Sequence, residues 1–306
     1  MTAAWPQPLQ RGDRVGLAAA SSALADDSLQ RLQAGVAVLE SWGLQVQPHP
    51  QPLRRWGHLA GADPERRADL QVGDLPLLAC IRGGWGAARL LEPGASSQAA
   101  DTGAQTHDTA GGGRWLLGFS DVTSLLWARQ AAGRAGGIHG PMVTTLAAEP
   151  DWSQQRLRDL LFGAPLAPLQ GEGWCAGAAE GPLLVGNLTV ATHLLGTAHL
   201  PPLDGAVLVL EDVGEAPYRI DRLLTHWRLC GALQKLAAIG FGSFSDCDDP
   251  ECPTPLELVL RERTADLGIP VLAGLPVGHT TGNAALPLGV RARLDADAGQ
   301  LELLPH

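Results

Sequence analysis

Short apolar runs, each followed by a turn and then by a helical pattern, dominate the first half of this 306-residue chain. Such runs occur at 15–20 (VGLAAA), 75–81 (LPLLACI) and 115–119 (WLLGF). After the first run, apolar residues spaced three or four apart predict a helix that ends at Gly43. A strand that is apolar on both sides needs helices on both faces of its sheet. The alternation therefore predicts a doubly wound, flavodoxin-like parallel sheet.

A Gly- and Pro-rich stretch after residue 160 (GAPLAPLQGEGW) separates this half from a second α/β-type region. There, a buried run at 205–210 ends in two carboxylates and leads into a helical pattern, and further short strands come after it. We predict an N-terminal domain at 1–162, a linker at 163–180, and a β-rich α/β domain at 181–306.

The composition excludes several classes of function. The chain carries 22 Lys and Arg against 32 Asp and Glu, a formal net charge of −10, without a basic run, which disfavours nucleic-acid binding. No stretch approaches the roughly 18 apolar residues of a membrane helix, and the first residues lack the order of a secretory signal. Five cysteines do not suggest a disulfide framework. We expect a cytoplasmic protein that binds neither nucleic acid nor membrane.

Serines follow two of the predicted strands. Ser21 and Ser22 are suited to cap the next helix. Ser120 lies in GFSDVT, at a strand-to-helix turn that would project its hydroxyl beside the first helical amides, as a nucleophile requires. The second glycine of G-x-S-x-G is replaced by Val122, so from the spacing alone a helix N-cap is the simpler interpretation.

The turn at 82–86 (RGGWG) follows another predicted strand. Its glycines allow close approach of the backbone to a ligand, and free amides there can bind negative charge. Neither a P-loop nor a G-x-G-x-x-G pattern is present, so a tight turn between strand and helix is the alternative.

Glu211 ends a buried strand, where open α/β sheets place their ligands. A carboxylate there needs a partner, and His279, also after a predicted strand, is a natural one. His139 and His193 are rival histidines, of which His193 is predicted to pack on its own helix. Taken singly, Glu211 and His279 are each more simply interpreted as ordinary loop residues.

Two polar segments lie outside the predicted strands and helices. The stretch at 94–113 has no periodicity and is expected to be an exposed loop, either mobile or a lid, of which a mobile loop is favoured, and its role stays open. Cys247 and Cys252 lie among acidic residues but lack further ligands at metal-site spacings, so we predict a polar loop and no metal. Cys80, inside an apolar run, is expected in the core.

Eight blocks spread in order along the chain carry a resemblance to one family. They are RGDRVGLAAASS near the start, LAGADPERRADL at 59–70, IRGGWGAARLL at 81–91, GFSDVTSLLWA from Gly118, IHGPM from Ile138, GNLTVATHLLGT from Gly186, VLEDVGEAPYRIDRLL from Val209 and PVGHTTGNAALPLG from Pro276. Together they resemble the serine LD-carboxypeptidases, also called muramoyltetrapeptide carboxypeptidases.

The resemblance implies a catalytic triad shared between the two domains. It makes Ser120 the nucleophile of the N-terminal domain, and Glu211 and His279 the acid and base of the C-terminal domain. It also implies an oxyanion hole from the backbone amides of Gly84 and Asp121. The active site would lie in a groove between the domains. Such a triad works through an acyl-enzyme.

The resemblance further implies a substrate and an assembly. The expected reaction removes the C-terminal D-alanine from a murein tetrapeptide during cell-wall recycling, with no cofactor or metal, in a homodimer. Arg82, Gly83, Trp85 and Arg219 are the expected substrate-binding residues, the two arginines by charge alone. Whether the third residue of the peptide is diaminopimelate or lysine stays open.

Some positions depart from the family pattern. Ala20-Ser21 replaces the usual Pro-Ser, and Trp85 replaces a tyrosine, which keeps an aromatic wall and removes a hydroxyl. The loop at 94–113 replaces a segment that is better structured in relatives. None of these changes affects the expected triad.

Three alternatives compete with this function. A microcin-immunity type of serine peptidase would cleave a peptide–nucleotide amide and use an added aromatic contact, for which Trp174 is a candidate beside linker packing. A silent muropeptide-binding protein would not need Ser120, Glu211 and His279 together. An α/β-hydrolase shares the chain order of the triad but needs all three residues on one sheet.

Overall fold

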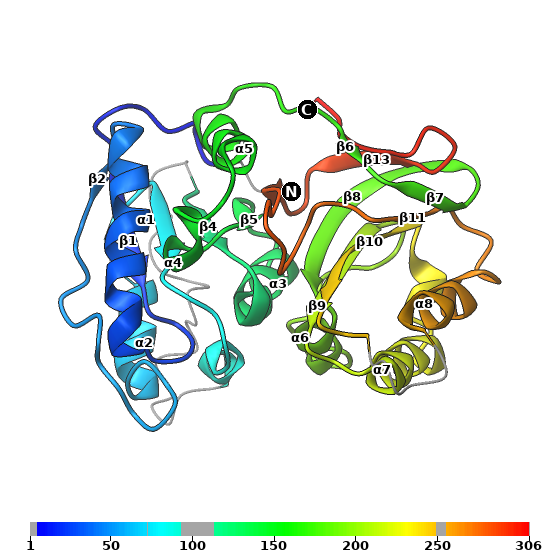
Figure 1. The fold of residues 1–306 in the computed structure, drawn as a ribbon, viewed down its shortest axis with the longest axis horizontal. Helices are drawn as coiled ribbons and strands as arrows, with labels where there is room; N and C mark the ends of the chain where they lie inside the picture. Colours follow the sequence, from blue (N-terminus) through cyan, green and yellow to red (C-terminus); the bar gives the residue numbers. More distant parts are fainter. Residues whose placement is uncertain (1–4, 72, 93–112, 249–254, 306) are drawn as a thin grey trace.

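The computed structural model describes residues 5–71, 73–92, 113–248 and 255–305. Apart from Gly113, the segment predicted as a loop at 94–113 lies outside the described residues. Cys252 lies outside them as well. The chain forms two β-sheets, each with its own helices, in two lobes placed side by side (Figure 1).

The first sheet has the strand order β12-β5-β4-β3-β1-β2. Its strands are β1 (Arg14–Ala18), β2 (Gln45–Val46), β3 (Leu77–Cys80), β4 (Trp115–Gly118), β5 (Gly137–His139) and β12 (Leu286–Pro287). β1 to β5 are parallel, whereas β12 is antiparallel to its neighbour β5. The order 2-1-3-4-5 is that of flavodoxin-like folds, which confirms the predicted fold class.

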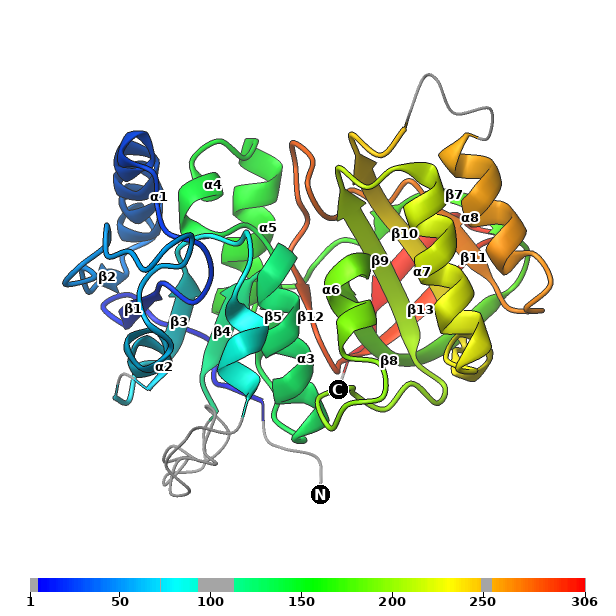
Figure 2. The same ribbon diagram turned by 90° about the horizontal axis from the view of Figure 1, so that it is seen from below.

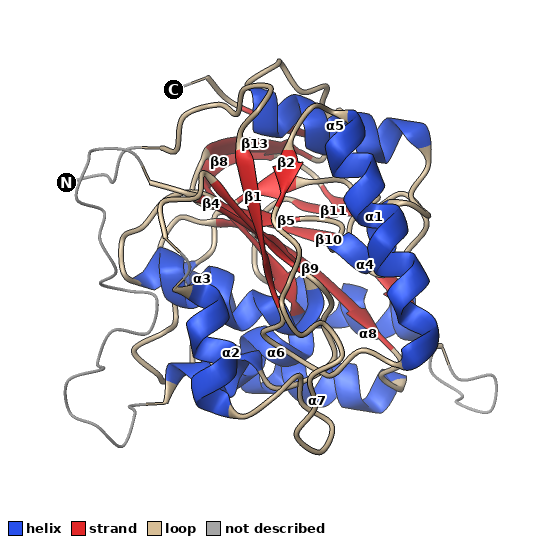
Figure 3. Cartoon of the chain, turned by 90° about the vertical axis from the view of Figure 1, so that its left-hand side faces the viewer, coloured by secondary structure: helices blue, strands red, loops and turns tan. Residues whose placement is uncertain are grey.

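Helices cover both faces of this sheet (Figure 3). Val15 and Leu17 pack in one apolar core with α1 and α5, whereas Leu78 and Cys80 point to the opposite face, toward α3 and η2. The helices of this domain are α1 (Leu29–Ser41), α2 (Asp63–Leu70), α3 (Thr123–Ala131), α4 (Val143–Leu146) and α5 (Asp151–Phe162), with 3₁₀ turns η1 (Asp26–Ser28), η2 (Ala87–Leu91) and η3 (Ser120–Val122). Burial on both faces explains why these strands are uniformly apolar.

The second sheet has the order β6-β14-β13-β8-β9-β10-β11-β7. Its strands are β6 (Leu169–Gln170), β7 (Glu172–Cys175), β8 (Ala178–Asn187), β9 (Val207–Val213), β10 (Ala238–Ser245), β11 (Val271–Ala273), β13 (Arg291–Asp295) and β14 (Gln300–Leu303). β8 to β11 are parallel and the flanking strands antiparallel. Beside them lie α6 (Leu188–His193), α7 (Pro217–Leu229), η4 (Leu233–Lys235) and α8 (Leu256–Thr264). This is the expected β-rich α/β domain.

The two domains are more interwoven than the predicted boundaries suggest. The range 163–180, expected as a linker, contains β6 and β7, which pair at the two edges of the second sheet. Near its end the chain returns to the first sheet, where Leu286 of β12 pairs with His139 of β5 (Figure 2). Glycine and proline mark the crossing but do not prevent short edge strands. The domain limits themselves stay a prediction.

The predicted helix cap by Ser21 and Ser22 is wrong. The N-cap of α1 is Ser28, because a turn and η1 intervene between β1 and α1. The hydroxyl of Ser22 instead accepts a hydrogen bond from the amide of Trp85 at 3.0 Å. This contact joins the loop after β1 to the glycine turn after β3.

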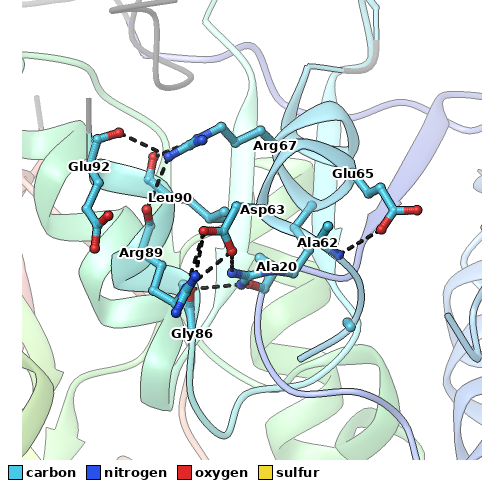
Figure 4. A network of polar contacts seen from close by, with 12 residues as sticks. Ala20, Ala62, Asp63, Glu65, Arg67, Gly86, Arg89, Leu90 and Glu92 are labelled. Carbon is cyan, nitrogen blue, oxygen red and sulfur yellow. Dashed lines mark hydrogen bonds and ion pairs between the residues drawn. The ribbon is translucent and has the colours of Figure 1, made fainter. Parts of the chain in front are cut away.

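A buried arginine joins the same two loops, and Figure 4 labels its partners Ala20, Asp63 and Gly86. The side chain of Arg66, on α2, is fully buried and donates to the carbonyl oxygens of Ala20 and, at 2.8 Å, Gly86. Its other nitrogen donates to Asp63 at 2.6 Å, and Asp63 also pairs with Arg89 at 2.9 Å. The hydrogen bond from Arg89, followed by that from Arg66, holds the pKa of Asp63 below its usual range.

We predict that Arg66→Met destabilises the fold by about 3–5 kcal/mol, because removing one member of a buried charged network leaves its partners without compensation. Arg89→Met, which removes the half-exposed partner of the same Asp63, should change stability little. The measurement is the urea unfolding midpoint of the three proteins. Equal midpoints for Arg66→Met and the wild type would contradict a structural role for the network.

Candidate active site

The carboxyl ends of several strands meet where the two domains touch. In the first sheet, β1 and β3 are neighbours. The chain leads from β1 to β2 on one side of this pair and from β3 to β4 on the other, so the strand order reverses between them. Open α/β sheets bind their ligands at such a switch point. The loops after β1, β3 and β4 place Ser22, Gly83 and Ser120 together there. The site therefore lies at the end of the sheet where open α/β folds place their ligands.

Ser120 adopts an unusual backbone conformation. Its φ of +60° is in the left-handed region, which costs a non-glycine residue energy; among the described non-glycine residues only Asp246 shares a positive φ. Ser120 opens η3, whose N-cap is Phe119, and α3 is capped at Val122. Ser120 is thus the N-cap of neither helical segment, and the N-cap interpretation is not supported. A strained serine between strand and helix is the geometry of a nucleophile turn.

The glycine turn at 82–86 lies directly against Ser120. A Cβ on Gly83 would stand 3.0 Å from the Cβ of Ser120, so this position tolerates only glycine without displacing one of them. Ser22 fixes the turn from outside, since its amide donates to the Gly83 carbonyl at 3.3 Å and its hydroxyl accepts from Trp85. Within the described chain the Gly84 amide has no acceptor, which leaves it available to a ligand.

Asp121 has a role that the sequence did not reveal. Its side chain is fully buried and accepts the amide of Ala87 at 2.8 Å, which ties the helix after Ser120 to the end of the glycine turn. Burial raises the pKa of this carboxyl, against hydrogen bonds that lower it. The sequence pointed only to its backbone amide, because an acidic residue after a serine is ordinary in a helix N-terminus.

The structure brings Glu211 and His279 together. Glu211 lies in β9 with its side chain fully buried, and its Oε2 stands 2.7 Å from His279 Nδ1. The backbone amide of His279 donates to the same oxygen at 3.3 Å. A Cβ on Gly278 would lie 2.5 Å from that oxygen, so glycine is required beside the carboxylate. The predicted pairing of this acid and this histidine is thus present in the fold.

The environment of His279 favours its charged form. Burial lowers the pKa of the imidazole, but the hydrogen bond and charge of Glu211, with the charge of Asp212, raise it more, and the net pKa is above the ordinary value. Because Nδ1 faces a carboxylate, the neutral form of the ring carries its proton on Nδ1, and Nε2 is left as the acceptor. The side chain of His279 is 22% exposed, so Nε2 can be reached by a substrate.

Phe119 connects the histidine to the serine. The rings of Phe119 and His279 are 4.8 Å apart, and Phe119 immediately precedes Ser120. No hydrogen bond joins Ser120 to His279 within the described residues. Bonds of this kind are often long in unliganded enzymes and tighten when substrate binds.

The rival histidines are placed elsewhere. His139 also contacts Phe119, with ring centroids 5.7 Å apart, and is fully buried. Burial, with the charge of His279, lowers its pKa to about 3, so it stays neutral. His193 points its ring at Trp85, 5.9 Å away, across the two domains. His279, rather than either rival, is the histidine paired with the buried carboxylate.

Asn187, which the sequence analysis missed, binds the second domain to the first. At the end of β8 its backbone amide donates to the Thr123 hydroxyl at 3.1 Å, and its side-chain Nδ2 donates to Asp212 at 2.9 Å. It also caps α6 by accepting the amide of Val190. An asparagine before a helical run is a recognisable cap signal, but the contact with Thr123 needs the tertiary structure.

The expected substrate-binding residues lie on two different elements. Gly83 and Trp85 belong to the glycine turn, and the Trp85 side chain is 41% exposed. Arg82, in the same turn, donates to the carbonyl of Ala23 at 2.9 Å and is thereby held in place. Arg219, in the first turn of α7, is exposed and pairs with Glu215 at 3.4 Å. The fold does not assign any of them a ligand.

The remaining candidates lie away from this constellation. Trp174 is in β7, packed against Phe241 at 5.8 Å and covered by the Arg261 guanidinium at 4.1 Å. Cys80 is buried in the core, as predicted, and Cys247 is buried beside the carbonyl of Ser245.

In the described part of the chain, no three His, Cys, Asp or Glu side chains are grouped to hold a metal ion. Among the same residues, no helix is long and apolar enough to span a membrane.

Comparison with known structures supports the fold. The structure of microcin C7 self-immunity protein MccF in complex with aspartyl sulfamoyl adenosine matches with a TM-score of 0.85 and 21% identity, covering 98% of both chains. Muramoyltetrapeptide carboxypeptidase from Oxalobacter formigenes matches with a TM-score of 0.78 and 27% identity, covering 94% of this chain and 97% of its own.

Sequence comparison identifies the family. A protein of Synechocystis sp., provisionally named a carboxypeptidase, is 46% identical over 309 residues, covering 98% of this chain and 97% of its own. The murein tetrapeptide carboxypeptidase of Pseudomonas aeruginosa is 36% identical over 304 residues, covering 93% and 94%. The models of the LD-carboxypeptidase N-terminal and C-terminal domains match residues 15–140 and 180–294. The chain therefore belongs to the LD-carboxypeptidase family.

Proposed function

We propose that this protein is a serine peptidase that removes the C-terminal D-alanine from murein tetrapeptides. The observation that carries the proposal is the 2.7 Å contact between His279 Nδ1 and the buried carboxylate of Glu211, beside a serine with a left-handed backbone. This arrangement has the parts of a nucleophile, a base and an orienting acid. The murein tetrapeptide carboxypeptidase among its relatives supports the substrate class.

In the proposed acylation step, His279 Nε2 takes the proton of Ser120 as the serine Oγ attacks the carbonyl carbon that precedes D-alanine. The oxyanion of the tetrahedral intermediate would accept hydrogen bonds from the amides of Gly84 and Asp121. Glu211 stabilises the imidazolium formed in this step, consistent with the raised pKa of His279. Collapse of the intermediate breaks the peptide bond, and the imidazolium gives its proton to the departing amine of D-alanine.

Deacylation uses the same groups in the reverse sense. His279 takes a proton from a water molecule, which attacks the ester carbonyl, and then returns that proton to Ser120 Oγ as the tripeptide leaves. In each step His279 accepts one proton and then releases it, so one imidazole is sufficient as both base and acid. Arg82 is the better placed candidate for the D-alanine carboxylate, because one of its nitrogens lies 3.6 Å from the Cβ position of Gly84.

Cleavage of a peptide–nucleotide amide is the second candidate function. Its support is the fold shared with MccF. The aromatic contact expected for that activity is not supplied by Trp174, whose ring is occupied by Phe241 and Arg261. This packing favours the murein peptide. The contact between Glu211 and His279 likewise disfavours a silent binding protein, which has no need to orient a base.

We predict that the purified protein releases D-alanine from L-alanyl-γ-D-glutamyl-diaminopimelyl-D-alanine in the presence of a chelator. Ser120→Ala should lower the rate by about 10⁴-fold or more while leaving the fold intact, because the residual catalysis of a triad enzyme without its nucleophile is small. Released D-alanine is quantified by chromatography, with circular dichroism as the control for folding. Release from a nucleotide-linked peptide but not from the tetrapeptide would reject the substrate and favour the MccF-type activity.

We predict a pH profile governed by His279. Because only the neutral imidazole accepts the serine proton, kcat/KM should rise with pH through the pKa of His279, which Glu211 and Asp212 raise above its ordinary value. Glu211→Gln removes the charge that stabilises the imidazolium, so the rising limb should move to lower pH. Its plateau should fall by about 10²–10⁴-fold. A limb at the same pH in both proteins would show that His279 is not the titrating base.

A further inference from the structure

The segment that carries His279 is a short loop closed on itself. Residues 278–283 (GHTTGN) lead from the second sheet toward β12 in the first sheet. The amide of Gly278 donates to Asn283 Oδ1 at 2.9 Å, which joins the two ends of the loop. Beyond it, the amide of Ala284 donates to the carbonyl of Pro276 at 2.7 Å. These two hydrogen bonds couple the ends of the loop, so a contact that holds Asn283 also restrains the segment that carries His279.

A second carboxylate holds this loop from the other domain. Glu149, in the turn between α4 and α5, accepts the amides of Gly282 and Asn283 on its Oε2, each at 2.9 Å. The hydroxyl of Ser153, on α5, lies 2.8 Å from the Asn283 carbonyl and 3.2 Å from the same Oε2. Figure 2 shows α4 and α5 beside the segment that descends to β12. These contacts cross from the domain of Ser120 to the loop of His279.

The Glu149 carboxylate accepts hydrogen bonds from two backbone amides and from a hydroxyl group. The carboxylate is half-buried, and within the described residues it forms no ion pair with a cation. Burial raises its pKa, and the two amides and Ser153 only partly offset that effect. A partly buried carboxylate whose partners are two successive backbone amides fixes the position of that backbone, because charge-assisted hydrogen bonds are short and directional.

We propose that Glu149 is a positioning residue for the base. This inference rests on the proposed function of Ser120 and His279. Glu211 orients the imidazole from the second domain, and Glu149 fixes the loop that bears it against the first domain, which sets the approach of the base to the nucleophile. Glu149 acts through the loop and touches no substrate.

The kinetic test compares Glu149→Ala with Glu149→Gln. The alanine variant loses both amide contacts, so kcat should fall by about 10- to 100-fold, as expected for a misplacement near 1 Å, with KM within about 3-fold of the wild type. The glutamine variant keeps an acceptor oxygen and should recover most of kcat. Glu257→Ala, which removes an exposed carboxylate on α8, is the matched control and should behave as the wild type. A glutamine variant no more active than the alanine variant would contradict the acceptor role.

A measurement without substrate separates this proposal from the proposed function. In NMR spectra of the full chain, Glu149→Ala should lose the exchange protection of the Gly282 and Asn283 amides by about 10-fold or more. If the wild type releases no D-alanine, the proposed function fails, and these NMR changes still decide whether Glu149 positions the loop.

A folded Glu149→Ala with wild-type kcat and unchanged amide protection would reject the proposal. If Glu149→Ala does not fold, Glu149→Asp provides the second test, because the shorter side chain draws the carboxylate back from the Gly282 and Asn283 amides and keeps its charge. A loss of kcat with reduced protection of these two amides supports the proposal, and wild-type values for both quantities overturn it.

Discussion

The fully buried carboxylate of Glu211 is the constraint on which the site depends. A lone charge in that position would cost several kcal/mol, so the fold must supply partners. It supplies them to one of the two oxygens, Oε2, through the ring and the backbone amide of His279, whereas Oε1 has no partner among the described residues. To reach Glu211, the chain after β11 has to turn back over β9, and Gly278 makes this approach sterically possible. The position of the imidazole thus follows from the need to satisfy one buried acid.

Several contacts within the first domain hold Ser120 in place. The left-handed conformation of this residue is unfavourable on its own and persists because its surroundings are fixed. Gly83 packs against the serine. The Asp121 carboxylate accepts the amide of Ala87 and so joins the following helix to the glycine turn, and Arg66 donates to the Gly86 carbonyl in that turn. Contacts across the domains, such as the Trp127 indole donating to the Val185 carbonyl at 2.9 Å, then fix the two halves against each other.

Two histidines beside one phenylalanine ring illustrate how environment assigns roles. His139 and His279 both contact Phe119, yet burial without a partner lowers the pKa of His139, while Glu211 raises that of His279. The same side chain stays neutral in one position and has a stabilised charged form in the other. Nothing in the residue types distinguishes them.

The parallel α/β architecture could be predicted from the amino-acid sequence, because strands buried on both faces leave uniformly apolar runs such as 75–81 and helices leave a periodic face. The sequence also indicated Ser120, Glu211 and His279, through strand-end positions and ordered family blocks. The three-dimensional structure was needed to show that β6 and β7 are strands, that β12 returns to the first sheet, and that Glu149 holds the His279 loop. These features join residues roughly a hundred or more positions apart, and long-range pairing leaves no local pattern in a single sequence.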